Sequence, residues 1–224
     1  MTPAMTQSST RILLIRHGES MAQANRIVGG HRGCIGLSEE GRAQASALAD
    51  RLKRTGELGN ATLVYTSVME RSVETARIVA DALGGLVLVS DCGFCENHPG
   101  EMDGLSWEEA DLRYPPIDWD PDGRRAPGIE TFSEMAVRVG RALDGLVRRH
   151  DGDTAVVVCH GGVVAHSMIR WLALDPSPAL GRRARIEPAN TSITEWLLSS
   201  GPADDRSSSA TLVRYNDHAH LALS

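Results

Sequence analysis

Aromatic side chains and positive charge are both in short supply in this chain. Phe, Trp and Tyr make up 4% of its 224 residues, and the formal net charge is -6. Few aromatic rings leave little surface on which nucleic-acid bases could stack, and an acidic chain offers no general attraction for a phosphate backbone. These shortages disfavour a nucleic-acid-binding module. A negatively charged substrate would have to be attracted by a local group of side chains.

Long hydrophobic runs are also missing, and no stretch approaches the ~20 apolar residues needed to span a bilayer. The first ten residues are small and polar, without the basic start and apolar centre of a signal peptide. The 42% hydrophobic composition suits one domain with its own core. We therefore expect a disordered tail over 1–10, one domain over 11–224, no membrane contact and a cytoplasmic location.

Cysteine is too scarce for a disulfide scaffold, because the chain has only four. We expect free thiols in a reducing compartment, with Cys159 packed inside a strand. Cys92 and Cys95 form a C-x-x-C pair, which could indicate a redox pair or half of a zinc site. No second C-x-x-C and no H-x-x-x-H accompanies them, so the sequence predicts no metal site and no cofactor.

Two short apolar runs, "RILLIRHG" and "TAVVVCHGG", each end at His-Gly. Such runs are typical of strands buried on both faces of a parallel sheet. Further strands are expected in "NATLVYTS" and "LVLVSD", a late hairpin is possible in "NTSITEWLLS" and "ATLVRYN", and helices are expected between the strands. This alternation predicts an α/β domain with a mostly parallel central sheet and helices on both faces.

Ligands of such sheets bind beyond the carboxyl ends of the strands, where Arg16, His17 and His160 are expected to meet. A neutral imidazole is nucleophilic at one nitrogen if an acceptor holds the proton of the other, and the Gly after His17 allows a backbone carbonyl to approach. Arginine binds phosphate or carboxylate oxygens with a planar fork. The pattern indicates nitrogen attack on a bound oxyanion, although solvated turns and structural histidines are the simpler alternative.

The segment "LIRHGES" resembles the signature of the histidine phosphatase superfamily, the phosphoglycerate mutase-like phosphatases and mutases. Six more segments resemble family motifs in the family's order, so the resemblance runs from Ile12 to about Leu198. These segments are "GLSEEGRAQA", "YTSVMERSVETA", "ENHPGEMDGLSWEE", "PGIETFSEMAVR", "VVVCHGG" and "NTSI". The resemblance implies a phosphoglycerate mutase-like fold.

The resemblance also implies the roles of five residues. His17 would be the nucleophile that forms a phosphohistidine, and Glu96 the general acid that protonates the leaving oxygen and later activates water. Arg16, Arg71 and His160 would bind the phosphoryl oxygens and stabilise charge in the transition state. Because these groups supply positive charge and donors, the resemblance implies catalysis without a metal.

The rim of the expected site departs from the family pattern. Many relatives carry Asn six residues after the nucleophile, where this chain has Gln23, with Asn25 two positions further on. His31 and Arg32 could recognise a second anionic group, or could simply belong to an exposed polar loop. The residues expected to bind substrate are Gln23, Asn25, Gly29, His31, Arg32, His98 and Gly161.

Three functions are compatible with these residues. The first is a metal-independent phosphatase acting on a small phosphomonoester. The second is a mutase, although the stretch 114–128, with Arg124 and Arg125, looks short and acidic beside the insertion with which mutases enclose a bisphosphorylated intermediate. The third is a domain that only binds a phosphorylated ligand, which the complete set of five residues disfavours. The sequence leaves open whether the protein is a monomer or a homodimer.

Overall fold

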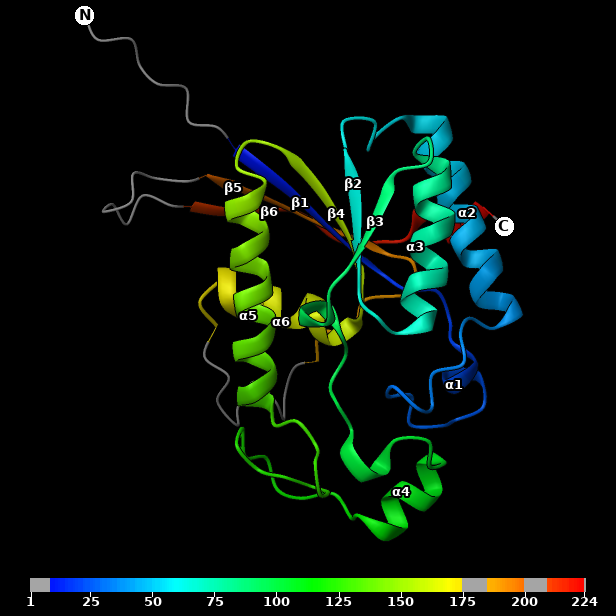
Figure 1. The fold of residues 1–224 in the computed structure, drawn as a ribbon, viewed down its shortest axis with the longest axis vertical. Helices are drawn as coiled ribbons and strands as arrows, with labels where there is room; N and C mark the ends of the chain where they lie inside the picture. Colours follow the sequence, from blue (N-terminus) through cyan, green and yellow to red (C-terminus); the bar gives the residue numbers. More distant parts are fainter. Residues whose placement is uncertain (1–8, 175–184, 200–208, 224) are drawn as a thin grey trace, which may run out of the picture.

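A computed structural model describes residues 9–174, 185–199 and 209–223 (Figure 1). Six strands of these residues form one sheet in the order β3-β2-β4-β1-β5-β6. Only β5 runs against its neighbours, so the predicted mostly parallel sheet is confirmed. The strands are β1 (Ser9–Arg16), β2 (Leu63–Thr66), β3 (Val87–Ser90), β4 (Thr154–Cys159), β5 (Ile193–Ser199) and β6 (Ser209–Asp217).

Helices cover both faces of the sheet, as Figure 1 shows. Helices α2 and α3 pack on one face and α5 and α6 on the other, while α1 and α4 lie beyond the end of the sheet. None of the helices in the described ranges is both long and apolar enough to cross a membrane. The helices are α1 (Met21–Ala24), α2 (Glu39–Thr55), α3 (Glu70–Ala82), α4 (Trp107–Arg113), α5 (Phe132–Arg149) and α6 (Gly161–Trp171).

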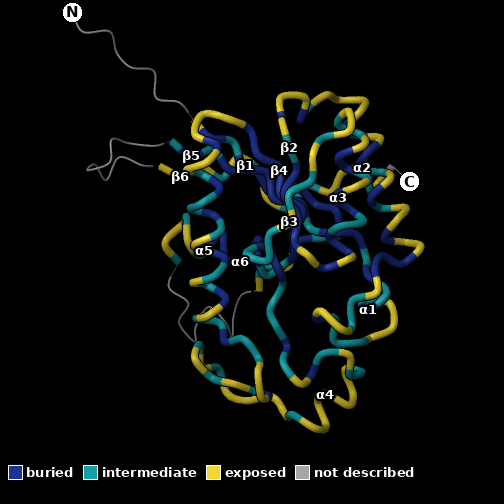
Figure 2. The backbone as a smooth tube through the Cα atoms, viewed as in Figure 1, coloured by how far each residue is buried: buried dark blue, intermediate teal, exposed yellow. Residues whose placement is uncertain are grey.

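Strand β1 is apolar throughout because both of its faces are buried. Ile12 and Leu14 pack with α5 and α6, whereas Leu13 and Ile15 pack with α2 and α3. All four side chains are fully buried, and Figure 2 shows the centre of the sheet, where β1 and β4 lie, in the dark blue of buried residues. Burial of such a side chain contributes roughly 1.5–3 kcal/mol, which explains why the run contains no alternating polar residue.

Capping residues mark both ends of helix α2. The Ser38 side chain accepts a hydrogen bond from the backbone N–H of Gly41, and Gly56 ends the helix in the left-handed conformation at φ 65°. Leu48 and Leu52 on its inner face are buried against the sheet. Helix α2 is therefore held rigidly against the sheet, beside the segment that follows β1.

The order of the strands brings the two His-Gly segments together. Strands β1 and β4 are parallel neighbours, and Arg16 is paired with Cys159, so the residues that follow leave the sheet side by side. The late hairpin is confirmed as β5 and β6, with β5 beside β1. Strand β1 already includes Ser9 and Thr10, which the sequence assigned to the tail, and residues 1–8 lie outside the described ranges.

Candidate active site

The two histidines lie against each other at the carboxyl end of the sheet. The ring centroids of His17 and His160 are 4.9 Å apart in an edge-to-face arrangement. His17 is 4% exposed and His160 is fully buried. The site predicted from the two strand ends is therefore assembled at the carboxyl ends of β1 and β4.

Hydrogen bonds fix which nitrogen of His17 is free to react. Its Nδ1 lies 2.6 Å from the carbonyl oxygen of Gly18, which can only accept, so Nδ1 carries the proton. Nε2 therefore keeps its lone pair. A side chain at Gly18 would be impossible here, because a Cβ atom would lie 2.4 Å from the carbonyl oxygen of Gly41. The Gly18 carbonyl oxygen is thus the backbone acceptor that the sequence suggested for His17.

Arg71 comes from the first turn of α3 and points at His17. Its Nε donates to His17 Nε2 over 3.1 Å, and its NH1 donates to the carbonyl oxygen of Gly29 over 2.9 Å. The residue is only 4% exposed. A guanidinium held at two points can turn its remaining donors to a bound phosphoryl group without losing its position.

One ring nitrogen of His160 is hydrogen-bonded and the other has no partner among the described residues. Its Nε2 lies 2.7 Å from the hydroxyl oxygen of Ser67, which itself accepts from the N–H of Met69. The Ser67 hydroxyl can therefore donate to Nε2, and His160 then carries its proton on Nδ1. That Nδ1 is buried and has no hydrogen-bond partner among the described residues. A buried donor without a partner is costly unless a ligand completes it.

Arg16 also has a buried side-chain nitrogen without a hydrogen-bond partner among the described residues. Its NH1 donates to the carbonyl oxygen of Pro188, whereas its buried Nε has no partner in the described part of the chain. Asn190 donates from Nδ2 to the carbonyl oxygen of His17 over 2.9 Å and holds the end of β1 in place. Ser67 and Asn190 are supporting residues whose roles the sequence reasoning missed, although both stand inside motifs of the family.

Burial and neighbouring cations keep both imidazoles neutral. Burial, followed by the charge of Arg71, lowers the pKa of His17 and of His160 well below the usual value for histidine. Burial also lowers the pKa of Arg16, against the opposing effect of Glu96. At neutral pH the site thus combines an unprotonated nucleophilic imidazole with guanidinium groups.

Glu96 reaches the site from the segment 91–98, which we call the acid loop. Its Oε2 accepts from the N–H of Gly162 over 3.1 Å, and its Oε1 accepts from the N–H of Asn97 over 3.1 Å. A Cβ atom on Gly162 would lie 2.1 Å from Oε1, so only glycine allows this approach. The first turn of α6 thereby positions the carboxylate that the sequence selected as general acid.

Arg138 of α5 holds the acid loop in place through hydrogen bonds to its backbone. Its guanidinium forms two bonds of 2.7 and 2.6 Å to the carboxylate of Glu130. The same group donates to the carbonyl oxygens of Cys92 and Cys95 at 3.1 and 3.0 Å, and to that of Glu96 at 3.3 Å. Arg138 ends the family motif "PGIETFSEMAVR", but the sequence analysis assigned it no role, because its partners in the acid loop are backbone atoms.

A cavity of about 290 Å³ opens in front of these groups. It is lined by Arg16, His17, Gly29, Arg71 and Glu96, with Gln23 and Trp107 at its side. The side-chain oxygen of Gln23 also caps α1 by accepting from Ser20. Asn25 is exposed at the end of α1 and does not line the cavity. Gly161 begins α6 next to His160 and does not line the cavity.

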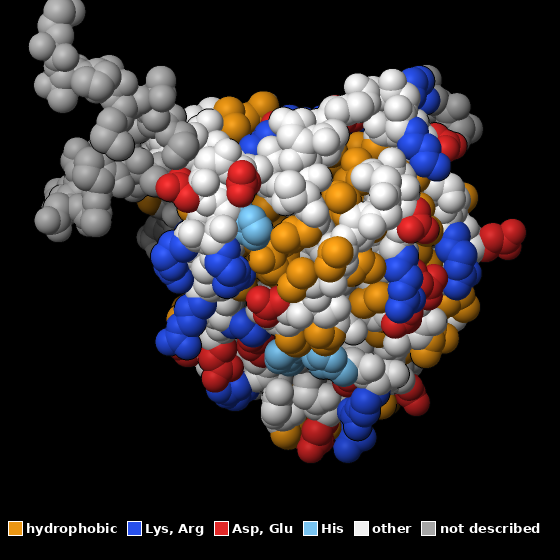
Figure 3. Space-filling model, turned by 45° about the horizontal axis from the view of Figure 1, so that its top comes forward, with side chains coloured by type: hydrophobic (Ala, Val, Ile, Leu, Met, Phe, Trp, Pro, Cys, Tyr) orange, Lys and Arg blue, Asp and Glu red, His pale blue; other side chains and the backbone are white. Residues whose placement is uncertain are grey.

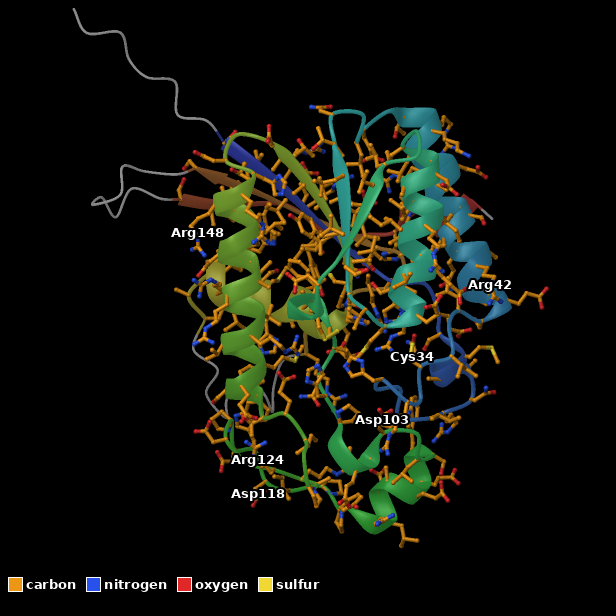
Figure 4. All side chains as sticks on the ribbon, in the orientation of Figure 1. Cys34, Arg42, Asp103, Asp118, Arg124 and Arg148 are labelled. Atoms are coloured by element: carbon orange, nitrogen blue, oxygen red, sulfur yellow. A yellow bond between two sulfur atoms is a disulfide. The ribbon has the colours of Figure 1, made fainter. Side chains whose placement is uncertain are left out.

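The other predicted rim residues lie elsewhere. Arg32 is exposed and bonded to Asp103, which also accepts from the N–H groups of Gly30 and Gly33 at 2.9 Å each. Asp103, which is labelled in Figure 4, joins the segment 27–36 to the loop before α4. His31 and His98 lie together, with ring centroids 5.1 Å apart, and neither lines the cavity.

The expectation of four free thiols is wrong for two of them. Cys34 and Cys159 are free, and Cys159 is buried in β4 as expected. Cys92 and Cys95 form a disulfide. The physical reason is the 3-10 turn at Cys92–Phe94, which brings the two Cα atoms to 4.8 Å, within the range that a disulfide can bridge.

Comparison with known proteins places this geometry in a family. The chain is 34% identical to phosphoglycerate mutase-like protein 4 of Arabidopsis thaliana, over 85% of this chain and 80% of that protein. It is 32% identical to the metal-independent phosphoserine phosphatase of the same plant, with the same coverage of 85% and 80%. The structure of Bacillus stearothermophilus YhfR matches with a TM-score of 0.77 at 28% identity, covering 95% of this chain and 99% of that one.

The sequence profile described as "Histidine phosphatase superfamily (branch 1)" matches residues 12–204. This span agrees with the region over which the motifs were recognised. The predicted family, the phosphoglycerate mutase-like fold and the enzyme class, a histidine phosphatase-type hydrolase, are confirmed. The chain belongs to the histidine phosphatase superfamily.

Proposed function

We propose that this enzyme hydrolyses small phosphomonoesters through a phosphohistidine on His17, without a catalytic metal. One observation carries the proposal: the unprotonated His17 Nε2, which accepts a hydrogen bond from Arg71 Nε, belongs to a residue lining a cavity edged by Arg16, Arg71 and Glu96. His160 adds an N–H donor whose partner no described residue supplies. The arrangement offers a nucleophile, donors for phosphoryl oxygens and an acid within one small space.

In the first step, His17 Nε2 attacks phosphorus and the bond between phosphorus and the ester oxygen breaks. Glu96 gives its proton to that oxygen, so the product leaves as a neutral alcohol. Charge on the three equatorial phosphoryl oxygens is met by the guanidinium groups of Arg16 and Arg71 and by the N–H of His160. These donors are in place beforehand, so little reorganisation accompanies the reaction.

In the second step, the Glu96 carboxylate takes a proton from water, and the resulting hydroxide oxygen attacks the phosphorus of phosphohistidine. The bond from phosphorus to His17 Nε2 breaks, which restores the neutral imidazole and releases inorganic phosphate. Glu96 ends the cycle protonated and ready for the next substrate. Throughout both steps the proton stays on His17 Nδ1 and is hydrogen-bonded to the Gly18 carbonyl oxygen. This hydrogen bond stabilises the positive charge that develops on the ring.

The size of the cavity supports a small substrate. A volume of about 290 Å³ is at the low end of the range for ligand sites. The phosphoserine phosphatase among the relatives acts on a substrate of this class according to its name. All five proposed catalytic residues come from one chain, so both a monomer and a homodimer could be active. The expected cytoplasmic location stays a prediction.

The positions of Arg124 and Arg125 support hydrolysis rather than mutase chemistry. Arg124 donates to the Ile129 carbonyl and to Glu134, and Arg125 donates to the Tyr114 carbonyl and is paired with Asp111. Neither arginine lines the cavity. Both are therefore engaged away from the place where a mutase would use them to enclose a second phosphoryl group.

The test is phosphate release from a panel of phosphomonoesters, measured in excess EDTA with the Cys92–Cys95 disulfide intact. The panel includes phosphoserine and 3-phosphoglycerate, and the isomers of each are monitored. His17→Ala is the control, and it should abolish both release and labelling of the protein by a 32P substrate. Isomer formation without phosphate release, or turnover that survives in His17→Ala, would contradict the proposal.

A further inference from the structure

Two cysteines and two histidines gather on the outer side of the acid loop, away from the catalytic cavity. Cys92, Cys95 and His98 come from that loop, and His31 comes from the segment 27–36, 61 positions before Cys92. The Sγ atom of Cys92 lies 3.9 Å from His31 Nε2 and 3.7 Å from His98 Nε2. The potential ligand atoms of all four residues lie within 4.8 Å of one another. Figure 3 shows histidine side chains gathered at the surface in the lower part of its view.

The distances from Cys92 Sγ to the two imidazoles are close to those of a tetrahedral metal site, and the two bonded sulfurs would have to separate on reduction. Zinc bonds of ~2.3 Å to sulfur and ~2.0 Å to nitrogen place neighbouring sulfur and nitrogen ligands about 3.5 Å apart and two sulfurs about 3.8 Å apart. The two distances from Cys92 Sγ to the imidazoles differ from this by a few tenths of an ångström. We propose that Cys92 and Cys95, once reduced, bind one Zn²⁺ ion together with His31 and His98.

Zinc and the disulfide exclude each other, because the metal binds thiolates. A dithiol reductant supplies two electrons and two protons to the Cys92–Cys95 bond and becomes a disulfide itself. Zn²⁺ then replaces the two thiol protons, which pass to solvent. The sequence analysis expected no metal because it found no second pair of ligands, and the fold supplies that pair from His98 and the distant His31.

Both segments of the site are held in position independently of a metal. On one side, Arg138 donates to the carbonyl oxygens of Cys92 and Cys95. On the other, Asp103 accepts from the N–H groups that flank His31, those of Gly30 at 2.9 Å and Arg32 at 2.8 Å. Segments that are already ordered lose little conformational entropy on binding. His31 is exposed and provides an entry route, whereas Cys95 is fully buried.

The ion would link the segment 27–36 to the acid loop. Glu96 stands between Cys95 and His98 in the sequence, and the carbonyl of Gly29, two residues before His31, holds Arg71. Four protein ligands leave no open position for water, so zinc here is structural and activates no nucleophile. This site is therefore compatible with catalysis by His17, and its existence does not depend on the proposed phosphatase activity.

The experiment is a metal titration of the full chain in a non-thiol phosphine reductant, with Co²⁺ as a spectroscopic probe and Zn²⁺ as competitor. One equivalent of Co²⁺ should give the visible bands of a tetrahedral ion and a thiolate charge-transfer band, and one equivalent of Zn²⁺ should remove them. His31→Ala removes an exposed side chain and should preserve the fold. We expect it to weaken Zn²⁺ binding at least about 100-fold.

Two controls separate this site from others. Cys34→Ser changes a free cysteine that lies outside the cluster, and His17→Ala changes the catalytic centre, so both should retain the affinity of the wild type. Unchanged binding in His31→Ala, or loss of binding in Cys34→Ser, would overturn the proposal. So would a reduced protein that binds no metal, or an oxidised protein that binds it equally well. An inactive enzyme in the phosphatase assay would leave these outcomes unaffected.

Discussion

Replacing Arg71 by lysine separates the geometry of the site from its charge. The guanidinium is 4% exposed and is held by two bonds, from Nε to His17 Nε2 and from NH1 to the Gly29 carbonyl. Lysine keeps the positive charge but has a single nitrogen on a flexible stem. It cannot donate in both of these directions and also form a two-pronged contact with a phosphoryl group.

The expected loss follows from the number of donors removed. Removal of one preorganised donor to a developing oxyanion costs about 2.7–4 kcal/mol, or a factor of about 10² to 10³ in kcat. Because charge on the phosphoryl oxygens is redistributed in the transition state, kcat should fall more than KM rises. Arg71→Lys is therefore expected to be slower by about two to three orders of magnitude, with its fold intact.

The measurement combines steady-state rates with quenched-flow detection of the 32P-labelled intermediate on His17. Arg77→Lys is the matched control, since Arg77 lies on the same helix with its guanidinium paired to Glu70 at the surface. The control should behave like the wild type. If Arg71→Lys formed the phosphoenzyme within about threefold of the wild-type rate, positive charge alone would suffice and the argument from bidentate geometry would be refuted.

Two further predictions concern the acid and the buried histidines. Gly162→Ala places a Cβ atom 2.1 Å from Glu96 Oε1, so the carboxylate must move, and turnover of alkyl phosphates should fall at least about tenfold. p-Nitrophenyl phosphate, whose leaving group needs little protonation, should be affected less, and equal losses would contradict the role of Glu96. Burial lowers the pKa of His220 to about 4 and that of His17 and His160 well below 6.5. The unfolded chain then binds more protons below pH 6.5, so the free energy of unfolding should fall between pH 6.5 and 4. Urea denaturation midpoints at several pH values would measure this, and a flat profile would show that these histidines are not buried in their neutral form.

The parts that sequence predicts well are those in which one physical requirement acts on consecutive residues. The run from Ile12 to Ile15 is apolar because both faces of β1 are covered, and the same holds for β4. Ser38 and Gly56 mark the ends of α2 by capping it. Parallel neighbours then bring His17 and His160 together, so the centre of the site follows from the fold class.

The contacts at the rim of the candidate site could not be predicted from the sequence, because they join distant loops through backbone atoms. Asp103 accepts from N–H groups around Arg32, and Arg138 donates to carbonyls of the acid loop. Asp103 and Arg138 both stand inside family motifs, but neither contact requires a particular residue type at the partner position, so the motifs do not reveal what the two side chains bind. His31 was therefore interpreted as a substrate residue, whereas the structure places it beside Cys92.

The unpartnered donors of the site explain why its histidines and arginines are buried together. His160 Nδ1 and Arg16 Nε lack hydrogen-bond partners among the described residues, which destabilises the ligand-free fold. Burial also lowers the pKa of His17, and this keeps the nucleophile unprotonated beside two guanidinium groups. A phosphoryl group satisfies the donors and balances the charge at the same time. The unpartnered donors and the neutral imidazole therefore have one physical origin, which is the burial of His17, His160 and Arg16 at the carboxyl end of the sheet.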